Sequence, residues 1–70
     1  MMETIDVVVN GERRAVARGA TLLELLRSLE LDPRAVVVEQ NRAIVRRPRL
    51  GDVTVAAGDA IELVHFVGGG

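Results

Sequence analysis

Hydrophobic and polar residues alternate, or form short apolar runs, at the start of this chain. Residues 5–9 (IDVVV) are short and rich in β-branched side chains, a composition that predicts a strand. Asn10 and Gly11 follow, and both residue types tolerate positive φ, so the pair predicts a tight hairpin turn. The returning strand is expected over residues 13–18, with Val16 facing inward.

The apolar spacing then changes to that of a helix. Leucines recur at i, i+3, i+4 and i+7, which places them on one face of a helix. They are Leu22, Leu25, Leu26 and Leu29. Thr21 stands before this stretch and Glu24 follows three residues later, the pairing that forms a capping box. Asp32 is expected to end the helix, because a residue before proline is disfavoured in the α region.

Residues 35–38 (AVVV) form a continuous apolar run, which predicts a strand inside the sheet that is covered on much of both faces. Asn41 is expected to turn the chain into a short strand over residues 43–45. Gly-Asp pairs at 51–52 and 58–59 predict turns on either side of a second β-branched segment. The stretch from 43 to 56 can therefore hold one long bent strand or two short ones.

The last predicted strand, residues 61–67, completes a hairpin, helix, strand order that matches the β-grasp arrangement. We expect an α+β fold with a mixed sheet of four to five strands, one main helix across one face, and the first and last strands parallel at the centre. Residues 1–67 form the β-grasp domain in this interpretation. Residues 68–70 form a flexible C-terminal glycine tail.

The last strand also predicts an exposed apolar surface. If Ile61 and Leu63 point at the helix, alternation sends Val64 and Phe66 to the opposite face. Scattered surface hydrophobics are ordinary and need no special explanation. The position of Val64, Phe66 and Val67 immediately before the glycine tail favours a partner-docking patch instead.

Composition limits the classes of function. Seventy residues make one domain with little room for an enclosed active site, and the absence of cysteine excludes disulfides and thiolate chemistry. The net charge of −1 does not call for a nucleic-acid or anionic-membrane partner. No apolar run is long enough to span a bilayer and no signal peptide is seen, so a cytoplasmic protein is expected.

Candidate catalytic residues are few. His65 is the only imidazole, and it lacks a second base or ligand, so we interpret it as a packing or surface residue. Arginines at 42, 46, 47 and 49 lack interleaved aromatics and are interpreted as a solvated face or a docking surface for an acidic partner. We find no catalytic dyad, metal ligand set or phosphate-binding loop, and expect neither enzymatic activity nor a bound cofactor.

Together these features resemble the ubiquitin-like sulfur carrier family, and within it the thiamin-biosynthesis carriers called ThiS. The segments that carry the resemblance are Asn10-Gly11, residues 19–22 (GATL), Leu25-Leu26, residues 36–38 and 43–45, Gly58-Asp59 with residues 61–64, and the terminal residues 66–70 (FVGGG). The Gly-Gly pair expected at the physical C-terminus is the specific part. Asn41-Arg42 departs from the Asn-Gly that the family often has at this turn.

The resemblance implies a chemical role for the tail. A ubiquitin-activating-type adenylating enzyme would use ATP and magnesium to convert the Gly70 carboxylate into an acyl-adenylate. A persulfide enzyme or sulfide would then replace the adenylate and leave a thiocarboxylate, whose sulfur passes to thiazole synthase. Gly68, Gly69 and Gly70 would suit a narrow pocket, since they lack Cβ atoms and reach about 10 Å beyond the folded body.

Other interpretations stay open at this point. The same chemistry serves carriers for molybdopterin synthesis and tRNA thiolation. A β-grasp RNA- or nucleotide-binding module would not need a free Gly-Gly end, and a glycine-rich end can also be a cloning remnant or a linker.

Overall fold

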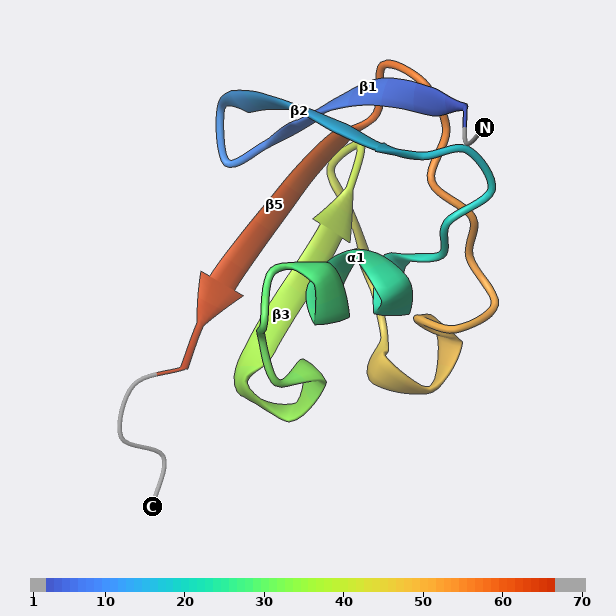
Figure 1. Ribbon diagram of the computed structural model, residues 1–70. Helices are drawn as coiled ribbons and strands as arrows, with labels where there is room; N and C mark the ends of the chain where they lie inside the picture. The colour runs from blue at the N-terminus through green and yellow to red at the C-terminus, as the bar shows by residue number, and fades with distance from the viewer. Residues whose placement is uncertain (1–2, 67–70) are drawn as a thin grey trace.

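The computed structural model describes residues 3–66 and contains one mixed five-stranded sheet with an α-helix across one face (Figure 1). The elements are β1 (Thr4–Val9), β2 (Glu12–Ala17), α1 (Leu22–Ser28), β3 (Val36–Gln40), β4 (Ala43–Val45) and β5 (Ala60–His65). The strand order is β2-β1-β5-β3-β4, with β1 and β5 parallel and the other neighbours antiparallel. The predicted β-grasp arrangement is confirmed, including its parallel central pair.

Two turns have the positive φ values that type I′ hairpins require at both central positions. Asn10 and Gly11 have φ of 49° and 82°, as the sequence predicts. Asn41 and Arg42 have φ of 52° and 72°. Arg42 is exposed, and its left-handed backbone conformation is one that glycine adopts without strain but a residue with a Cβ does not. The second turn is therefore strained at this position, whereas the first turn has Gly11 there.

Replacing Arg42 by Gly is therefore expected to stabilise the fold. The gain is about 0.5–1 kcal/mol, because relief of the left-handed conformation exceeds the extra entropy that glycine gives the unfolded chain. Thermal unfolding should shift upward by several degrees. Asn41→Gly is the matched control at the same turn and should destabilise, since the Asn41 side chain bonds Asp59 at 3.0 Å and the Ala60 amide at 2.9 Å. Equal effects of the two substitutions would contradict this account.

Helix α1 begins as predicted but ends earlier. The Thr21 hydroxyl accepts from the Glu24 amide at 3.1 Å and the Glu24 carboxylate accepts from the Thr21 amide at 2.9 Å, which completes the capping box. The helix ends at Ser28, and Glu30, two residues later, has a positive φ of 60°. The prediction that Asp32 ends it is wrong.

A Schellman motif accounts for the early end of α1. The Leu31 amide donates to Leu26 at 2.9 Å, and the Glu30 amide donates to Arg27 at 3.0 Å, the two backbone bonds that define the motif. Asp32 caps a separate 3₁₀ turn instead, Pro33–Ala35.

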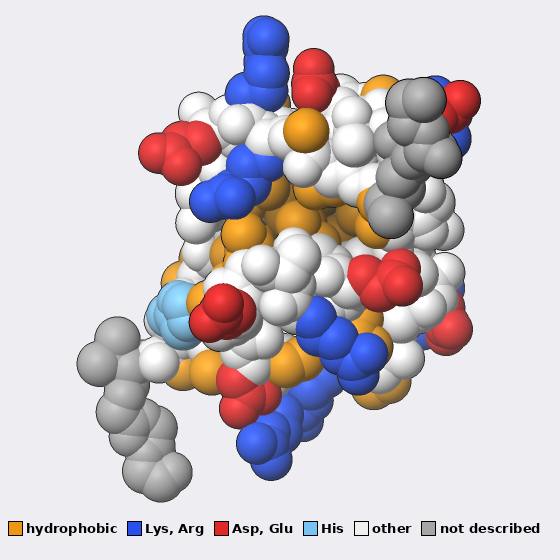
Figure 2. Space-filling model, in the orientation of Figure 1, with side chains coloured by type: hydrophobic (Ala, Val, Ile, Leu, Met, Phe, Trp, Pro, Cys, Tyr) orange, Lys and Arg blue, Asp and Glu red, His pale blue; other side chains and the backbone are white. Residues whose placement is uncertain are grey.

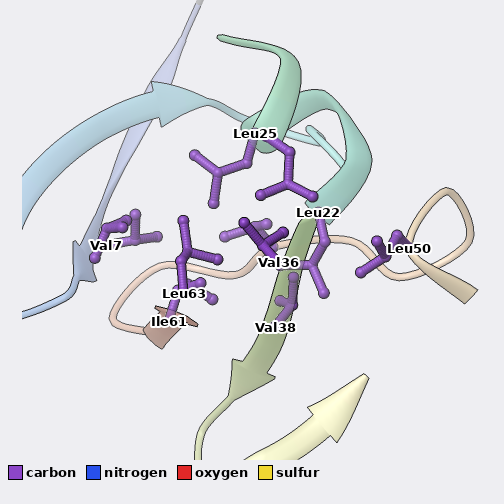
Figure 3. Packing of buried hydrophobic residues seen from close by; sticks show 11 residues of the cluster. Val7, Leu22, Leu25, Val36, Val38, Leu50, Ile61 and Leu63 are labelled. Carbon is purple, nitrogen blue, oxygen red and sulfur yellow. The ribbon is translucent and has the colours of Figure 1, made fainter. Parts of the chain in front are cut away.

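The core lies between α1 and one face of the sheet, and Figure 3 shows helix and strand side chains converging there. Its buried members are Val7, Val9, Leu22, Leu25, Leu26, Val36, Val38, Leu50, Val55, Ile61 and Leu63. Two of them, Leu50 and Val55, come from the connection between β4 and β5. Val16 is half-buried and packs against this core, as expected.

The stretch from 43 to 56 contains one short strand and no second one. After β4 the chain forms a 3₁₀ turn, Arg47–Arg49, and then a single bridge between Thr54 and Thr21. The backbone bonds near this bridge go to the start of α1, where the Val55 amide donates to Ala20 at 2.8 Å. Residues 53–55 therefore do not extend the sheet. In the described part of the chain no helix has the length and apolar character to cross a membrane.

Candidate functional site

Strand β5 is held from both sides along most of its length. From the β1 side, the Asn10 side chain continues the ladder after β1 has turned away: its Oδ1 accepts from the Leu63 amide at 2.7 Å and its Nδ2 donates to the Leu63 carbonyl at 3.2 Å. From the β3 side, the Phe66 amide donates to the Ala35 carbonyl at 2.9 Å. The segment that leads to the C-terminal residues is thus fixed as far as Phe66.

Asp59 fixes the start of the same strand. Its buried carboxylate accepts from the Ala56 amide and from Gln40 Nε2, both at 2.8 Å, and from Asn41 Nδ2 at 3.0 Å. Burial by itself would raise the pKa of Asp59, but these three hydrogen bonds to the ionised form outweigh it and hold the pKa below its ordinary value. The sequence identified Asp59 only as a turn residue.

Replacing Asp59 by Asn is expected to lower the free energy of unfolding by about 1–3 kcal/mol, because the amide NH₂ group would face a donor. The pKa of Asp59 in the folded protein lies below its ordinary value of 3.8. The carboxylate therefore contributes to the free energy of unfolding above pH 3.8, and this contribution is lost as the pH falls through the pKa of the folded state. Urea unfolding at neutral and acidic pH measures both effects. Asp52→Asn, in the other Gly-Asp turn, is the control and should change little.

Residues along β5 alternate between the two faces as predicted. Ile61 and Leu63 are buried against the helix side. Val64 and Phe66 are each 57 % exposed. Val64 lies opposite Val37 on β3, and Ile44 of the edge strand β4 is 64 % exposed. We call Val37, Ile44, Val64 and Phe66 the apolar patch; it lies on the sheet face that α1 leaves open.

A shallow groove of about 380 Å³ runs through this patch. Val37, Ile44 and Phe66 line it together with Arg46, Arg47 and Pro48. Val37 and Ile44 were not predicted from the sequence as patch members. For Ile44 the alternation of its short strand was the available signal, because Val45 packs toward the core and so leaves its neighbour outward.

The other predicted site residues fall outside the described part of the chain. Val67, Gly68, Gly69 and Gly70 follow the last described residue, Phe66. The predicted roles of the tail and of Val67 therefore stay predictions.

His65 lies on the face opposite the apolar patch. It pairs in register with Val36 of β3 and is exposed beside Leu29 and Leu31. Among residues 3–66 no three histidine, aspartate or glutamate side chains gather where they could hold a metal ion. The exposure of His65 agrees with interpreting it as a surface residue.

A hollow of about 480 Å³ opens on the helix side, between β2 and α1, with apolar side chains at its floor (Figure 2). The charged residues in its lining are Arg18 and Glu24. Arg18 pairs with Glu3 at 2.7 Å, and Glu24 belongs to the capping box. Both charges therefore already have partners within the fold.

A β-grasp body with an exposed apolar patch at the end of its last strand, followed in sequence by Val67 and three glycines, is typical of the class of ubiquitin-like carrier proteins. The sequence pattern of the ThiS family matches residues 7–70. The chain belongs to the ThiS family, the sulfur carrier proteins of thiamine biosynthesis.

Individual relatives support this assignment. The sulfur carrier protein ThiS of Bacillus subtilis is 44% identical over 50 residues, 71% of this chain and 76% of that protein. The crystal structure of thiamine biosynthesis protein ThiS from Geobacter metallireducens superposes with a TM-score of 0.81 at 35% identity, covering 94% of this chain and 100% of that one. This superposition confirms the β-grasp fold.

A thiazole synthase of Magnetococcus marinus is also similar. It is 45% identical over 66 residues, which cover 94% of this chain. The chain spans only 20% of the length of that relative.

Proposed function

We propose that this chain delivers sulfur for thiazole formation as a thiocarboxylate on Gly70, the C-terminal residue of the mature protein in this scheme. The Gly70 carboxylate attacks the α-phosphate of magnesium-bound ATP in an adenylating enzyme of the ubiquitin-activating type, and pyrophosphate leaves. Sulfide then attacks the acyl carbon, a C–S bond forms and AMP leaves. With a persulfide enzyme as donor, a thiol must also reduce the resulting acyl disulfide.

The observation that carries this proposal is the extent of the family match, which runs through the glycines at residues 68–70. The fold adds a physical reason. Strand β5 is anchored up to Phe66, so the segment that leads to the tail of residues 68–70 starts from a fixed point beside the apolar patch. Residues 1–67 serve as the body that presents the tail.

Docking of the patch is needed on energetic grounds. Ordering three glycines in a partner's pocket costs roughly 3–6 kcal/mol. Burying the exposed part of Phe66 returns only about 2–3 kcal/mol. Val64, Val67 and the remaining patch residues supply the rest in this proposal.

Thiazole synthase is the proposed sulfur acceptor. The relative from Magnetococcus marinus that carries this name holds a region similar to 94% of this chain within a longer polypeptide. A carrier-like segment joined to such an enzyme favours thiazole synthase over a molybdopterin or tRNA-thiolating client. The chain itself acts as a protein cosubstrate: ATP and magnesium belong to the activating enzyme, and the cytoplasmic location stays a prediction.

The test is intact-mass analysis of the protein after incubation with ATP, magnesium, the adenylating enzyme of the same organism and sulfide. Exchange of one oxygen for one sulfur, mapped by fragmentation to Gly70, is the expected result. Omitting ATP is the control and should leave the mass unchanged. A natural protein that extends beyond Gly70, or one that stays unloaded with the active enzyme, would overturn the proposal.

The acceptor is tested separately. Titration of the loaded protein with thiazole synthase and with the large subunit of molybdopterin synthase should show binding to the first. Binding to the second alone would reassign the client and leave the carrier chemistry intact.

A further inference from the structure

We infer that the open face of the sheet docks in a single orientation, on a protein surface that places carboxylates opposite Arg46 and Arg47 and a cationic side chain opposite Glu39 and Glu62. The inference rests on the proposed function for the claim that this face meets a sulfur-transfer enzyme. It adds the chemistry of the partner surface: an apolar centre with acidic groups on one side and a basic group on another.

The cationic side of the surface borders the apolar patch. Arg46 and Arg47 line the same groove as Phe66, and both are exposed. Within residues 3–66 the ion pairs are Arg18–Glu3 and Arg34–Asp32, so neither Arg46 nor Arg47 has a carboxylate within 4.0 Å. Hydrogen bonds from Arg34 hold the pKa of Asp32 below its ordinary value, and Arg47 adds only a weak attraction to that carboxylate. Two guanidinium groups are thus available to a partner.

The anionic side is a like-charge pair. Glu39 of β3 and Glu62 of β5 lie directly opposite each other, and side chains in this position have Cβ atoms only about 4.5–5.5 Å apart. Like charges so placed repel. On its other side Glu39 faces Ile44, which cannot neutralise it. No cation of the described chain pairs with either glutamate, so the fold retains a repulsion that a partner's arginine or lysine would relieve.

The register fixes how these charges lie relative to the tail. One step along the open face from the Glu39–Glu62 row, about 7 Å away, lies the row of Val37 and Val64. The next step reaches Phe66, which bonds Ala35. The glutamate pair therefore lies in the row of Ile44, two steps from Phe66 on the side away from the tail, while Arg46 and Arg47 follow the end of β4 and border the groove.

Opposite charges on different sides of an apolar centre select one docking orientation. A rotated alignment would separate the glutamates from the partner's cation and the arginines from its carboxylates, and any like-charge contacts it formed would suppress it. Only the correct alignment directs the segment after Phe66 toward the partner's active site. The charges thus act as positioning groups, whereas the patch supplies the contact area.

The sharpest test neutralises the glutamate pair. Glu39→Gln/Glu62→Gln should raise the thermal stability of the free protein, because it removes the internal repulsion, and yet weaken binding to the adenylating enzyme about tenfold. Arg46→Gln/Arg47→Gln should also weaken binding about tenfold, without the gain in stability. Arg13→Gln, on the same face of the distant edge strand β2, is the matched control and should bind within about twofold of wild type.

Binding is measured by surface plasmon resonance at low and high ionic strength, and loading by intact mass. Wild-type binding should weaken with salt, and each double variant should lose part of that dependence. Unchanged affinity of either double variant, with wild type still loaded, overturns this inference and leaves the proposed function standing. If the wild-type protein binds but is never loaded with sulfur, the proposed function is wrong. The affinities of the two double variants then still decide whether the charged groups orient docking. Wild type that does not bind overturns both.

Discussion

A chain that ends at Gly69 is expected to lose sulfur loading almost completely. The truncated protein still ends in a glycine carboxylate, so the reacting group is chemically the same. It lies about 3.5 Å short of its position in the full chain, however, and displacements as small as 1 Å can lower a rate about a hundredfold. We therefore expect at least about a hundredfold slower thiocarboxylate formation, measured by intact mass over time.

The control for this truncation removes one residue from the other end. Deleting Met2 changes the length equally and should leave loading at the wild-type rate. Thermal unfolding of both proteins should match that of wild type, since both deletions leave the described fold, residues 3–66, complete. Loading of the Gly69-ended chain at the full rate would show that reach is not what the tail provides.

Local sequence rules predicted the elements of this fold well. The Asn10-Gly11 turn depends on residues adjacent in sequence, and the capping box depends on Thr21 and Glu24, three residues apart. The alternation that exposes Val64 and Phe66 is also a local property of a strand. Each of these features is decided within one turn or one strand, so neighbouring residues were sufficient to predict it.

The features that were missed depend on contacts between distant segments. Asp59 receives hydrogen bonds from Gln40 and Asn41, which are 19 and 18 residues away, and only the β3–β5 pairing brings them together. The early end of α1 requires Glu30 in a left-handed conformation, and this position lacks the glycine that would usually indicate such a conformation in a sequence. Residues 53–55 resemble a strand in composition, but their backbone bonds go to the start of the helix.

The candidate site also combines features that depend on local sequence with features that depend on contacts between distant segments. Alternation along the last strand predicted Val64 and Phe66, and the structure extends the patch to Ile44 and Val37 through strand neighbours that sequence could not identify. The tail itself was recognised from composition. The chemistry proposed for it rests on family membership and not on geometry.

Replacing Phe66 by Asp is expected to weaken binding to both the adenylating enzyme and thiazole synthase about 30- to 1,000-fold. Phe66 is the only aromatic residue of the chain, and a buried aromatic at the centre of an interface typically contributes about 2–4 kcal/mol. The fold should tolerate the change, because the side chain is already 57 % exposed and its backbone bond to Ala35 is kept. Calorimetric titration measures the affinity and thermal unfolding the stability.

Val8→Asp is the matched control for this substitution. Val8 is an apolar residue on the same open face, 37 % exposed, but it lies on β1 beside Ala60 at the opposite end of β5 from Phe66. A general effect of placing a carboxylate on an apolar face would weaken binding by either variant. Selective loss with Phe66→Asp instead places the contact at the tail end of the sheet, where docking also fixes the starting point of the glycines. Unchanged affinity of Phe66→Asp for both enzymes would remove Phe66 from the interface.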